Sequence, residues 1–485
     1  MIEKIRNGAF WVSIISLLAM PFAYYRSWIL NQIDSTGELL GLFALLLVFI
    51  ELAITMSIFG GASSLANYIP KISGNNNRFR FIFSFSIVSI LFSLIFLLVL
   101  RDHRVIDFLS LSDIYENNVG ELFFLTILLV ISQIGIYCLN GFFKFRLSSF
   151  LSNIQVVFVC FYLTVVYFYQ TEIDNQTAIK QIMYLIISVY VLVSVVSFVK
   201  INFFSVSSVI GRFCYFPTGF FKFSIFMHGN TFCTMVYLTA DRIILASKFG
   251  LSTLAMYYVF SQIAEVIRFI PNKIGQVLLA SFSKMENSLS GEELKSSYKE
   301  VIENIVLISS VITISIIIFS SQISGFFNYS SKENILMLNL LTIFTCIGAI
   351  GPVNAMLVMS KEKSVDYFLN SIFQIASQLV FIFTTIDELG IYSVVFGKGI
   401  GIIFAQFGLL FILRFRLKLN FASLPLSYYA CQFICIINAV LVYMFEINIK
   451  YSFVTYLLSM FFVMIFNRKA FGNIKKIFVR RVEVL

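Results

Sequence analysis

The sequence has few charged residues and almost no histidine, and each shortage excludes a class of protein. Only 12% of the 485 residues are charged, against about 25% in an average soluble protein. Two histidines are too few for a histidine metal cluster, and no phosphate-cradling glycine loop or zinc-ligand spacing occurs. We therefore expect no soluble enzyme, no catalytic residues, no bound metal and no cofactor.

Most of the residues in the chain are apolar. Hydrophobic residues make up 59% of the chain, phenylalanine alone supplies 57, and the mean hydropathy is +0.91. A membrane-spanning helix needs about 20 mostly apolar residues, and the sequence predicts fourteen such spans. They cover 8–30, 39–62, 81–100, 121–143, 148–169, 181–199, 218–246, 254–280, 301–323, 335–358, 366–385, 390–413, 427–445 and 451–467. The expected fold class is an all-α polytopic membrane protein.

The distribution of lysine and arginine predicts how these spans are oriented in the membrane. If the N-terminus lies inside, the inner loops and tail carry 24 of the 35 basic residues, and the outer loops carry six. This asymmetry follows the positive-inside rule, so we expect both termini on the cytoplasmic side of the membrane. We interpret the first run as a retained helix rather than a cleaved signal peptide. Topology explains the net charge of +10, and we expect no nucleic-acid partner.

We assign eight charged residues to the membrane interior, and we assign Glu121, Lys222, Glu303 and Asp366, which lie near the ends of predicted spans, to the adjoining loops. A cation near the bilayer centre costs about 2.5–3.5 kcal/mol on insertion scales, so such residues normally face a bundle interior or a watery cavity. Cations outnumber acids, which favours a water-filled cavity with a positive lining. The cations are Arg26, Arg242, Arg268, Lys273 and Lys398, and the acids are Glu51, Asp241 and Glu265.

The cations differ in how strongly they indicate a binding role. Arg26 could line the cavity or reach the lipid headgroups with its long side chain, and Lys273, just past Pro271, could approach the inner interface. Lys398 lies in the middle of its span between two glycines, with no acid nearby in sequence, so it is the strongest candidate for substrate binding.

The acids favour pairing or ion coupling. Asp241 precedes Arg242 and suggests a local ion pair, and Glu265 lies three residues before Arg268, on the same helix face. Glu51 could pair with Arg26 or titrate a coupling proton, and the sequence does not separate these readings.

A loose internal repeat suggests two related halves. Tyr24-Tyr25-Arg26, Gly41 and Glu51 recur as Ala240-Asp241-Arg242, Tyr257 and Glu265, at offsets of about 215 residues. Parallel repeats of this kind occur in transporters, with the site between the halves. We expect domains at 1–200 and 201–420, followed at 421–485 by two further spans and a basic cytoplasmic tail.

Several of these stretches resemble a known family. The first stretch runs from Phe221–Ser224 to Asp241–Ala246. The second begins at Gly250 and runs through Leu254–Tyr258 to Leu278–Lys284. The third comprises Gly8, Trp11, Arg26, Gly41-Leu42 and Gly60 and ends at Tyr68–Lys71. Together with the length and span count, they resemble Wzx-type O-antigen and capsule repeat-unit flippases. These belong to the multidrug/oligosaccharidyl-lipid/polysaccharide exporter superfamily.

The resemblance implies two six-helix bundles around a V-shaped cavity, and a substrate. That substrate is an undecaprenyl-pyrophosphate-linked oligosaccharide, moved from the cytoplasmic to the outer leaflet. Cationic cavity residues of the family match Arg26, Arg268 and Lys398. Implied partners are membrane lipids, a polysaccharide polymerase and chain-length proteins. Coupling to a proton or sodium gradient, or to the membrane potential, stays open. Lipid II flippases carry further arginines in the second span that this chain lacks.

Three other functions stay open on the sequence. A cation-coupled multidrug antiporter of the same superfamily should favour an acidic cavity, whereas cations outnumber acids here. A membrane-embedded polysaccharide polymerase or glycosyltransferase should present a large outer loop, and the loops are short. A scaffold for a synthesis complex would leave the intramembrane cations unexplained.

Overall fold

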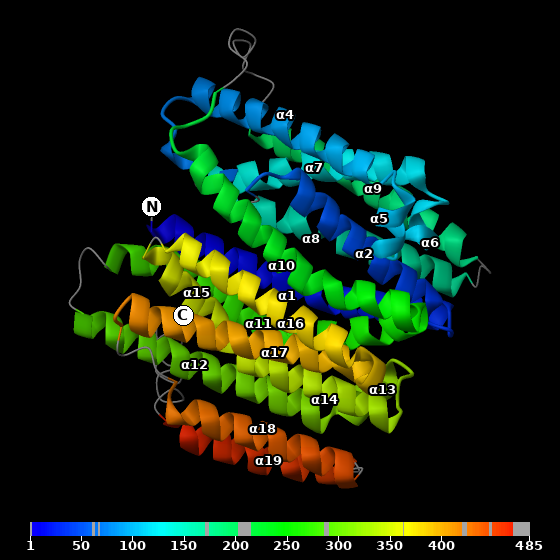
Figure 1. Ribbon diagram of the computed structural model, residues 1–485, viewed down its shortest axis with the longest axis vertical. Helices are drawn as coiled ribbons and strands as arrows, with labels where there is room; N and C mark the ends of the chain where they lie inside the picture. Colours follow the sequence, from blue (N-terminus) through cyan, green and yellow to red (C-terminus); the bar gives the residue numbers. More distant parts are fainter. Residues whose placement is uncertain are drawn as a thin grey trace. The chain divides into compact units, whose positions relative to one another are not determined.

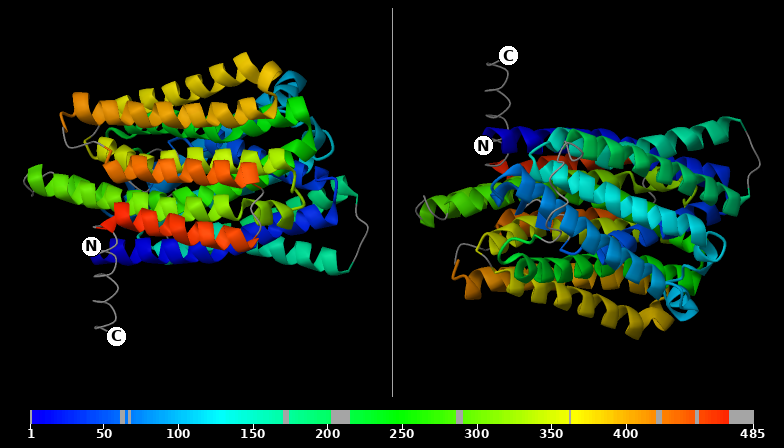
Figure 2. Two further views of the ribbon diagram at one scale, coloured as in Figure 1. Left: turned by 90° about the horizontal axis from the view of Figure 1, so that it is seen from below. Right: turned by 90° about the horizontal axis from the view of Figure 1, so that it is seen from above.

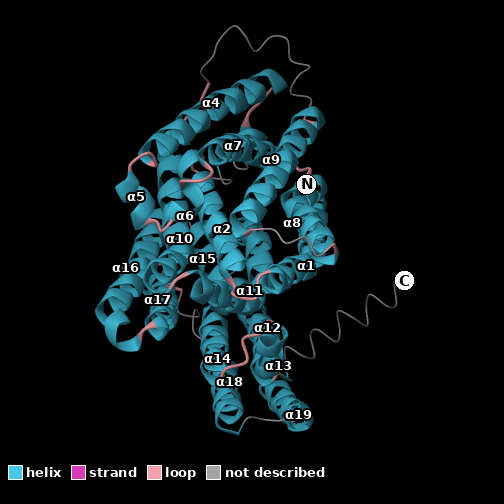
Figure 3. Ribbon diagram, turned by 90° about the vertical axis from the view of Figure 1, so that its right-hand side faces the viewer, coloured by secondary structure: helices cyan, strands magenta, loops and turns pink. Residues whose placement is uncertain are grey.

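The computed structural model describes most of the chain, and all structural statements concern the described part. That part is residues 2–60, 64–65, 68–169, 174–201, 215–285, 291–361, 363–419, 424–445 and 449–468. Within it, residues form helices and connecting loops, and none forms a strand (Figure 3). The basic tail predicted beyond the last span lies, from residue 469 onward, outside the described residues.

The chain divides into two compact units. Unit 1 comprises Met1–Tyr258 and unit 2 comprises Val259–Leu485. The helix α11 (Leu251–Met285) begins in the first and continues into the second. The other long helices of unit 1 are α1 (Ile2–Ile33), α2 (Glu38–Ser57), α4 (Asn75–Val99), α7 (Val119–Gly141), α8 (Phe145–Phe168), α9 (Asn175–Lys200) and α10 (Phe220–Phe249). Its short helices are η1 (Ile69–Lys71), α5 (His103–Phe108) and α6 (Ser112–Tyr115).

Unit 2 is built from helices that come later in the chain. These are α12 (Gly291–Ile318), α13 (Ser320–Phe326), α14 (Lys332–Ile347), η4 (Gly348–Ile350), α15 (Gly351–Ser360), α16 (Ser364–Leu389), α17 (Ile391–Phe411), η5 (Ile412–Arg416), α18 (Leu426–Phe445) and α19 (Ile449–Phe466). Within this unit α12, α14, α18 and α19 lie side by side, and α16 packs along α17 (Figure 1).

Every predicted span coincides with a helix or a helical pair, so the all-helical, multi-pass fold class is confirmed. By length and composition, ten helices in the described part are apolar enough to cross a membrane. The tenth predicted span, 335–358, is interrupted: α14 ends at Ile347, η4 follows, and α15 begins at Gly351 before Pro352. Proline lacks an amide proton and suits the first turn of a new helix.

The buried core of unit 1 forms around α2. This helix contacts α1, α4, α7, α9 and α10, and most of its residues from Leu39 to Ala53 are buried. In the same unit, α1 and α8 run side by side (Figure 2). Because α2 is surrounded by other helices, most of its side chains are held among protein groups.

Asp34 caps the beginning of α2. Its carboxylate accepts hydrogen bonds from the Leu39 backbone N–H at 2.8 Å, the Thr36 backbone N–H at 2.9 Å, and the side chains of Thr36 and Asn175. Partial burial acts to raise the pKa of Asp34, but these hydrogen bonds outweigh it and hold the pKa below its ordinary value. The cap therefore favours the charged carboxylate.

α2 ends earlier than the predicted boundary at residue 62. Its last residue is Ser57, and Ile58 is extended with φ −100° and ψ 96°. Gly60 then has φ +76°, a left-handed conformation that glycine adopts without steric cost. A β-carbon on Gly60 would also lie 2.9 Å from the Ser224 β-carbon. The glycine therefore turns the chain just after the helix and lets α10 approach closely.

Candidate functional site

Arg26 is buried in unit 1 despite its charge. Its side chain is 4% exposed, and its Nη2 donates a hydrogen bond of 3.3 Å to the Tyr258 hydroxyl group. The guanidinium carbon also lies 4.6 Å from the centroid of the Phe43 ring, within range of a cation–π interaction. The helices α1, α2 and α11 together hold this charge in place.

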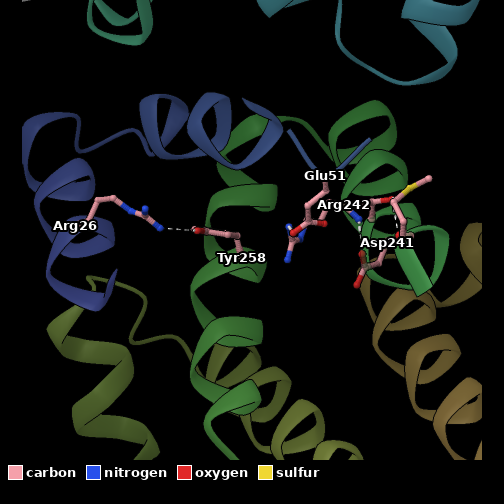
Figure 4. A network of polar contacts seen from close by, with 7 residues as sticks. Arg26, Glu51, Asp241, Arg242 and Tyr258 are labelled. Atoms are coloured by element: carbon pink, nitrogen blue, oxygen red, sulfur yellow. Dashed lines mark hydrogen bonds and ion pairs between the residues drawn. The ribbon is translucent and has the colours of Figure 1, made fainter. Parts of the chain in front are cut away.

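Glu51 pairs with Arg242. The Nη1 atom of Arg242 lies 3.8 Å from Oε1 of Glu51, and the guanidinium carbon lies 5.5 Å from the Tyr258 ring centroid. The sequence had suggested Arg26 as one partner for Glu51; the structure instead gives it the arginine of α10. Figure 4 shows Arg26 and Arg242 approaching Tyr258 from different sides.

Asp241 is fully buried and is held by local hydrogen bonds. Its Oδ2 accepts a hydrogen bond from the Tyr257 hydroxyl group, and its Oδ1 accepts one of 2.8 Å from the Arg242 backbone N–H. The sequence suggested an ion pair between Asp241 and Arg242; the hydrogen bond here comes from the Arg242 backbone, while the Arg242 side chain pairs with Glu51. Together with the preceding contacts, these bonds place the four unit 1 candidates in one polar network with two tyrosines.

The tyrosines are the part of this network that the sequence reasoning missed. Tyr257 and Tyr258 are almost completely buried, and their hydroxyl groups serve Asp241 and Arg26 respectively. A buried tyrosine usually finds a hydrogen-bond partner for its hydroxyl group. Two adjacent tyrosines in an otherwise apolar run were the available signal.

In unit 2, Glu265 and Arg268 form the pair that their spacing predicts. The distance from Arg268 Nη1 to Glu265 Oε1 is 3.7 Å. Further along α11, Lys273 Nζ lies 5.6 Å from the ring centroid of Phe269, which is one helical turn before it. Both cations thus have a partner on their own helix.

Lys398 is buried in α17 and only 5% exposed. The glycines beside it admit the neighbouring helices: a β-carbon on Gly397 would lie 3.1 Å from the Gln378 carbonyl oxygen of α16, and one on Gly399 would lie 2.5 Å from the Phe344 ring of α14. The lysine is therefore held on a helix that is packed on two sides.

Arg268 approaches the region of α17 that follows Lys398. A β-carbon on Gly348 would lie 2.9 Å from the Ile402 side chain and 3.9 Å from Arg268 Nε. Ile402 is one helical turn after Lys398, on the same face of α17. The structure therefore brings Arg268 into the surroundings of the helix that carries Lys398.

The two units differ in the charge balance of their candidate residues. In unit 1, Arg26 and Arg242 are matched by Glu51 and Asp241. In unit 2 the candidate set has three cations, Arg268, Lys273 and Lys398, and one acid, Glu265. The excess intramembrane positive charge of the candidate set is thus carried by unit 2. Among the residues that the structure describes, no three His, Cys, Asp or Glu side chains are grouped to hold a metal ion.

Comparison with known proteins shows the fold. No protein-family profile and no curated protein sequence matches the chain. Among solved structures, the lipid II flippase MurJ in an inward closed conformation is similar over 96% of this chain and 99% of that chain, with a TM-score of 0.68 and 14% identity.

Two other solved structures extend this result. An inward-facing multidrug resistance MATE family transporter of the MOP superfamily is 15% identical, covers 84% of this chain and 98% of that chain, and has a TM-score of 0.63. A MOP superfamily transporter from Pyrococcus furiosus is 13% identical; the match covers 87% of this chain and 96% of that chain, with a TM-score of 0.59. The chain therefore has the fold of MOP superfamily transporters.

Proposed function

We propose that this protein is a flippase for undecaprenyl-pyrophosphate-linked oligosaccharide repeat units. It moves them from the cytoplasmic to the outer leaflet of the bacterial plasma membrane by alternating access, for synthesis of O-antigen, capsule or exopolysaccharide. Both termini then lie on the cytoplasmic side, and a polymerase and chain-length proteins act next. The observation that carries this proposal is the excess of cations over acids among the intramembrane candidate residues of unit 2, in a fold similar to that of a lipid II flippase.

The charge of the substrate explains why cations are needed. A pyrophosphate diester carries about two negative charges, and one cation at 4 Å contributes about 4 kcal/mol at an effective dielectric constant near 20, before desolvation. Lys398 and Arg268 could hold such a headgroup at membrane depth while the polyprenyl tail stays in lipid. Arg26 and Lys273 are the other proposed substrate-binding cations.

The membrane potential offers a driving force. Moving one elementary charge across 100 mV is worth about 2.3 kcal/mol. Two negative charges leaving an inside-negative cell would therefore release about 4.6 kcal/mol. Counter-movement of a proton or sodium ion would add to this, with Glu51, Asp241 and Glu265 as the proposed groups.

A multidrug antiporter is the second candidate, because MATE transporters share the fold. Such a protein binds cationic compounds and needs uncompensated acids at its site. In unit 1 the acids Glu51 and Asp241 have arginine and tyrosine partners, and in unit 2 Glu265 has Arg268. This pairing favours the anionic, lipid-linked substrate.

The test compares three lysine variants in the source strain with this gene deleted. Lys398→Ala should abolish surface polysaccharide and leave single undecaprenyl-linked repeat units at the inner leaflet. Lys398→Arg keeps the charge and should restore part of the surface glycan. The matched control Lys363→Ala, at an exposed position in the same unit, should behave as wild type. If surface glycan is unchanged in the deletion and sensitivity to cationic dyes shifts instead, the antiporter is favoured.

A further inference from the structure

The interruption between α14 and α15 changes the backbone hydrogen bonds inside a candidate membrane span. In a continuous α-helix the Ile347 carbonyl oxygen would accept from the Gly351 N–H, and the Gly348 carbonyl oxygen from the N–H of residue 352. The Gly351 N–H bonds to the Gly348 carbonyl oxygen instead, and residue 352 is a proline, which has no N–H. Both carbonyl groups therefore lack the donor that an α-helix would give them.

Side chains from two neighbouring helices donate to these carbonyl groups. The Tyr428 hydroxyl group of α18 donates a hydrogen bond of 3.0 Å to the Ile347 carbonyl oxygen. The Gln406 Nε2 atom of α17 donates one of 3.4 Å to the Gly348 carbonyl oxygen. Both side chains are buried, Tyr428 with 7% and Gln406 with 8% exposed. Because an unpaired carbonyl group inside a membrane is costly, these two bonds contribute to holding the helix in its interrupted form.

Gly351 lets the Gln406 amide reach the backbone. A β-carbon on Gly351 would overlap the Gln406 amide nitrogen and would lie 3.3 Å from the amide carbon. The Gln406 Oε1 atom is buried and, among the described residues, has no hydrogen-bond partner. The amide is therefore held at the interruption through its Nε2 atom.

α15 can act as a lever beyond the interruption. It has ten residues, which at about 1.5 Å per residue make about 15 Å of helix. Asn354, in its first turn, accepts a hydrogen bond of 2.7 Å from the Tyr298 hydroxyl group of α12, so this attachment lies close to the interruption. A change of about 20° in the helix direction there would move the far end of α15 by about 5 Å.

We propose that this interruption is a hinge with two forms. In the interrupted form, which the structure has, the Gly351 N–H bonds to Gly348 and Tyr428 donates to Ile347. In the α-helical form the Gly351 N–H bonds to the Ile347 carbonyl oxygen, the Tyr428 hydroxyl group is released, and Gln406 is the donor to Gly348. Tyr428 therefore selects the interrupted form, and Gln406 makes the α-helical form affordable despite the proline.

The hinge connects α15 to the helix that carries Lys398. Gln406 lies about two turns after Lys398 on α17, so the amide attaches the pivot of α15 to that helix. Discontinuous helices at membrane depth are a recurrent feature of transporter sites. The role of the hinge in moving a substrate rests on the proposed function, whereas the two forms of the helix do not.

The experiment measures the position of α15 within unit 2 by pulsed EPR in lipid nanodiscs. Spin labels are attached through a non-natural ketone amino acid, so the seven native cysteines stay in place. One pair joins Lys361, directly after α15, to Arg468, after α19. α15 packs on α16 and α17, and α19 packs on α12 and α18, so this pair spans the unit (Figure 1). The control pair joins Arg416, which follows α17, to the same Arg468.

Tyr428→Phe should raise the ratio of the α-helical to the interrupted form by about five-fold, as expected for one hydrogen bond. The distance between Lys361 and Arg468 should then gain a population shifted by up to about 5 Å, while the control pair stays unchanged. The matched variant Tyr429→Phe, at the exposed neighbouring tyrosine, should behave as wild type. An unchanged distance in Tyr428→Phe, an equal change in the control pair, or the same change in Tyr429→Phe would overturn the proposal.

Two further variants test the assigned hydrogen bonds. Pro352→Ala restores an N–H group for the Gly348 carbonyl oxygen and should shift the distance in the same direction as Tyr428→Phe. Adding Gln406→Leu to Tyr428→Phe should reverse the shift, because Gly348 would have no donor in the α-helical form. A larger shift in this double variant would contradict the hinge.

The hinge and the proposed function can fail separately. A moving Lys361 pair in a protein that does not flip repeat units would contradict the proposed function and leave the hinge intact. Flipping by a protein whose Lys361 pair never moves in these variants would overturn the hinge alone.

Discussion

The Nη1 atom of Arg242 lies 3.8 Å from Oε1 of Glu51, so an acid and a base from two different helices are paired within unit 1. Removing one partner leaves the other charge in a largely apolar environment. For a buried pair the loss is about 3–5 kcal/mol, and for an exposed one about 0–1 kcal/mol. The Glu51 side chain is 40% exposed, which places it between these limits.

We expect Glu51→Ala to lower the free energy of unfolding by about 1–3 kcal/mol, which lies between the buried and exposed limits. The thermal unfolding midpoint in detergent measures this. The double variant Glu51→Ala with Arg242→Ala should be less destabilised than the sum of the single variants, because neither charge is then left alone. Strict additivity would show that the pair is not coupled.

The adjacent tyrosines should respond differently to loss of their hydroxyl groups. Tyr257→Phe removes the hydroxyl donor from Oδ2 of the buried Asp241 carboxylate, whose Oδ1 keeps the Arg242 backbone N–H, and should cost about 1.5–3 kcal/mol, as for hydrogen bonds to charged groups. Tyr258→Phe removes one acceptor from Arg26, which keeps its contact with the Phe43 ring, and should cost about 1 kcal/mol. The two midpoints, measured side by side, check the order; a larger loss at Tyr258 would contradict it.

Gly41 should not tolerate a methyl group. A β-carbon there would lie 2.8 Å from the Leu251 carbonyl carbon and closer still to its oxygen, and backbone atoms cannot move aside cheaply. We expect Gly41→Ala to lower the free energy of unfolding by about 1–3 kcal/mol, as for overpacked cores. The control is Gly120→Ala in α7, where nothing lies within 4 Å of the new carbon, and this variant should be neutral or stabilised by up to about 1 kcal/mol. Equal effects of the two substitutions would refute the close approach.

Stability should depend on pH through Asp34. Because its folded-state pKa lies below the ordinary 3.8, the stabilisation that its charge provides is present above that value and is lost as the pH falls through the folded-state pKa. The gap in unfolding midpoint between wild type and Asp34→Ala should therefore be constant from about pH 7 to about pH 5 and should narrow below about pH 4. A difference in unfolding midpoint that widens as the pH falls would contradict this prediction.

Much of the fold could be predicted from the sequence, because the length of a continuous apolar run indicates the length of the membrane-spanning helix. The runs at 121–143 and 427–445 matched α7 (Val119–Gly141) and α18 (Leu426–Phe445) closely. Interruptions inside a run were not visible in the same way. The end of α2 at Ser57 and the break between α14 and α15 occur within apolar sequence, where only glycine and proline mark a change.

The partners of charged residues were harder to derive. The pair Glu265 and Arg268 follows from helix periodicity, and it forms. Glu51 and Arg242 belong to helices distant in sequence, and which residues meet there depends on how α10 packs on α2. Hydropathy contains no information on that packing. The hydrogen bond from Arg26 to Tyr258 was missed for the same reason.

The glycines of α17 restrict how Lys398 can move. Gly397 and Gly401 face the backbone of α16 at Gln378 and Gln374, while Gly399 faces the Phe344 ring of α14 on another side. Turning α17 about its own axis would drive larger side chains into both neighbours. The ammonium group can therefore change direction through its own side-chain torsions, or travel with α14, α16 and α17 as one body, but not by axial rotation of the helix that carries it.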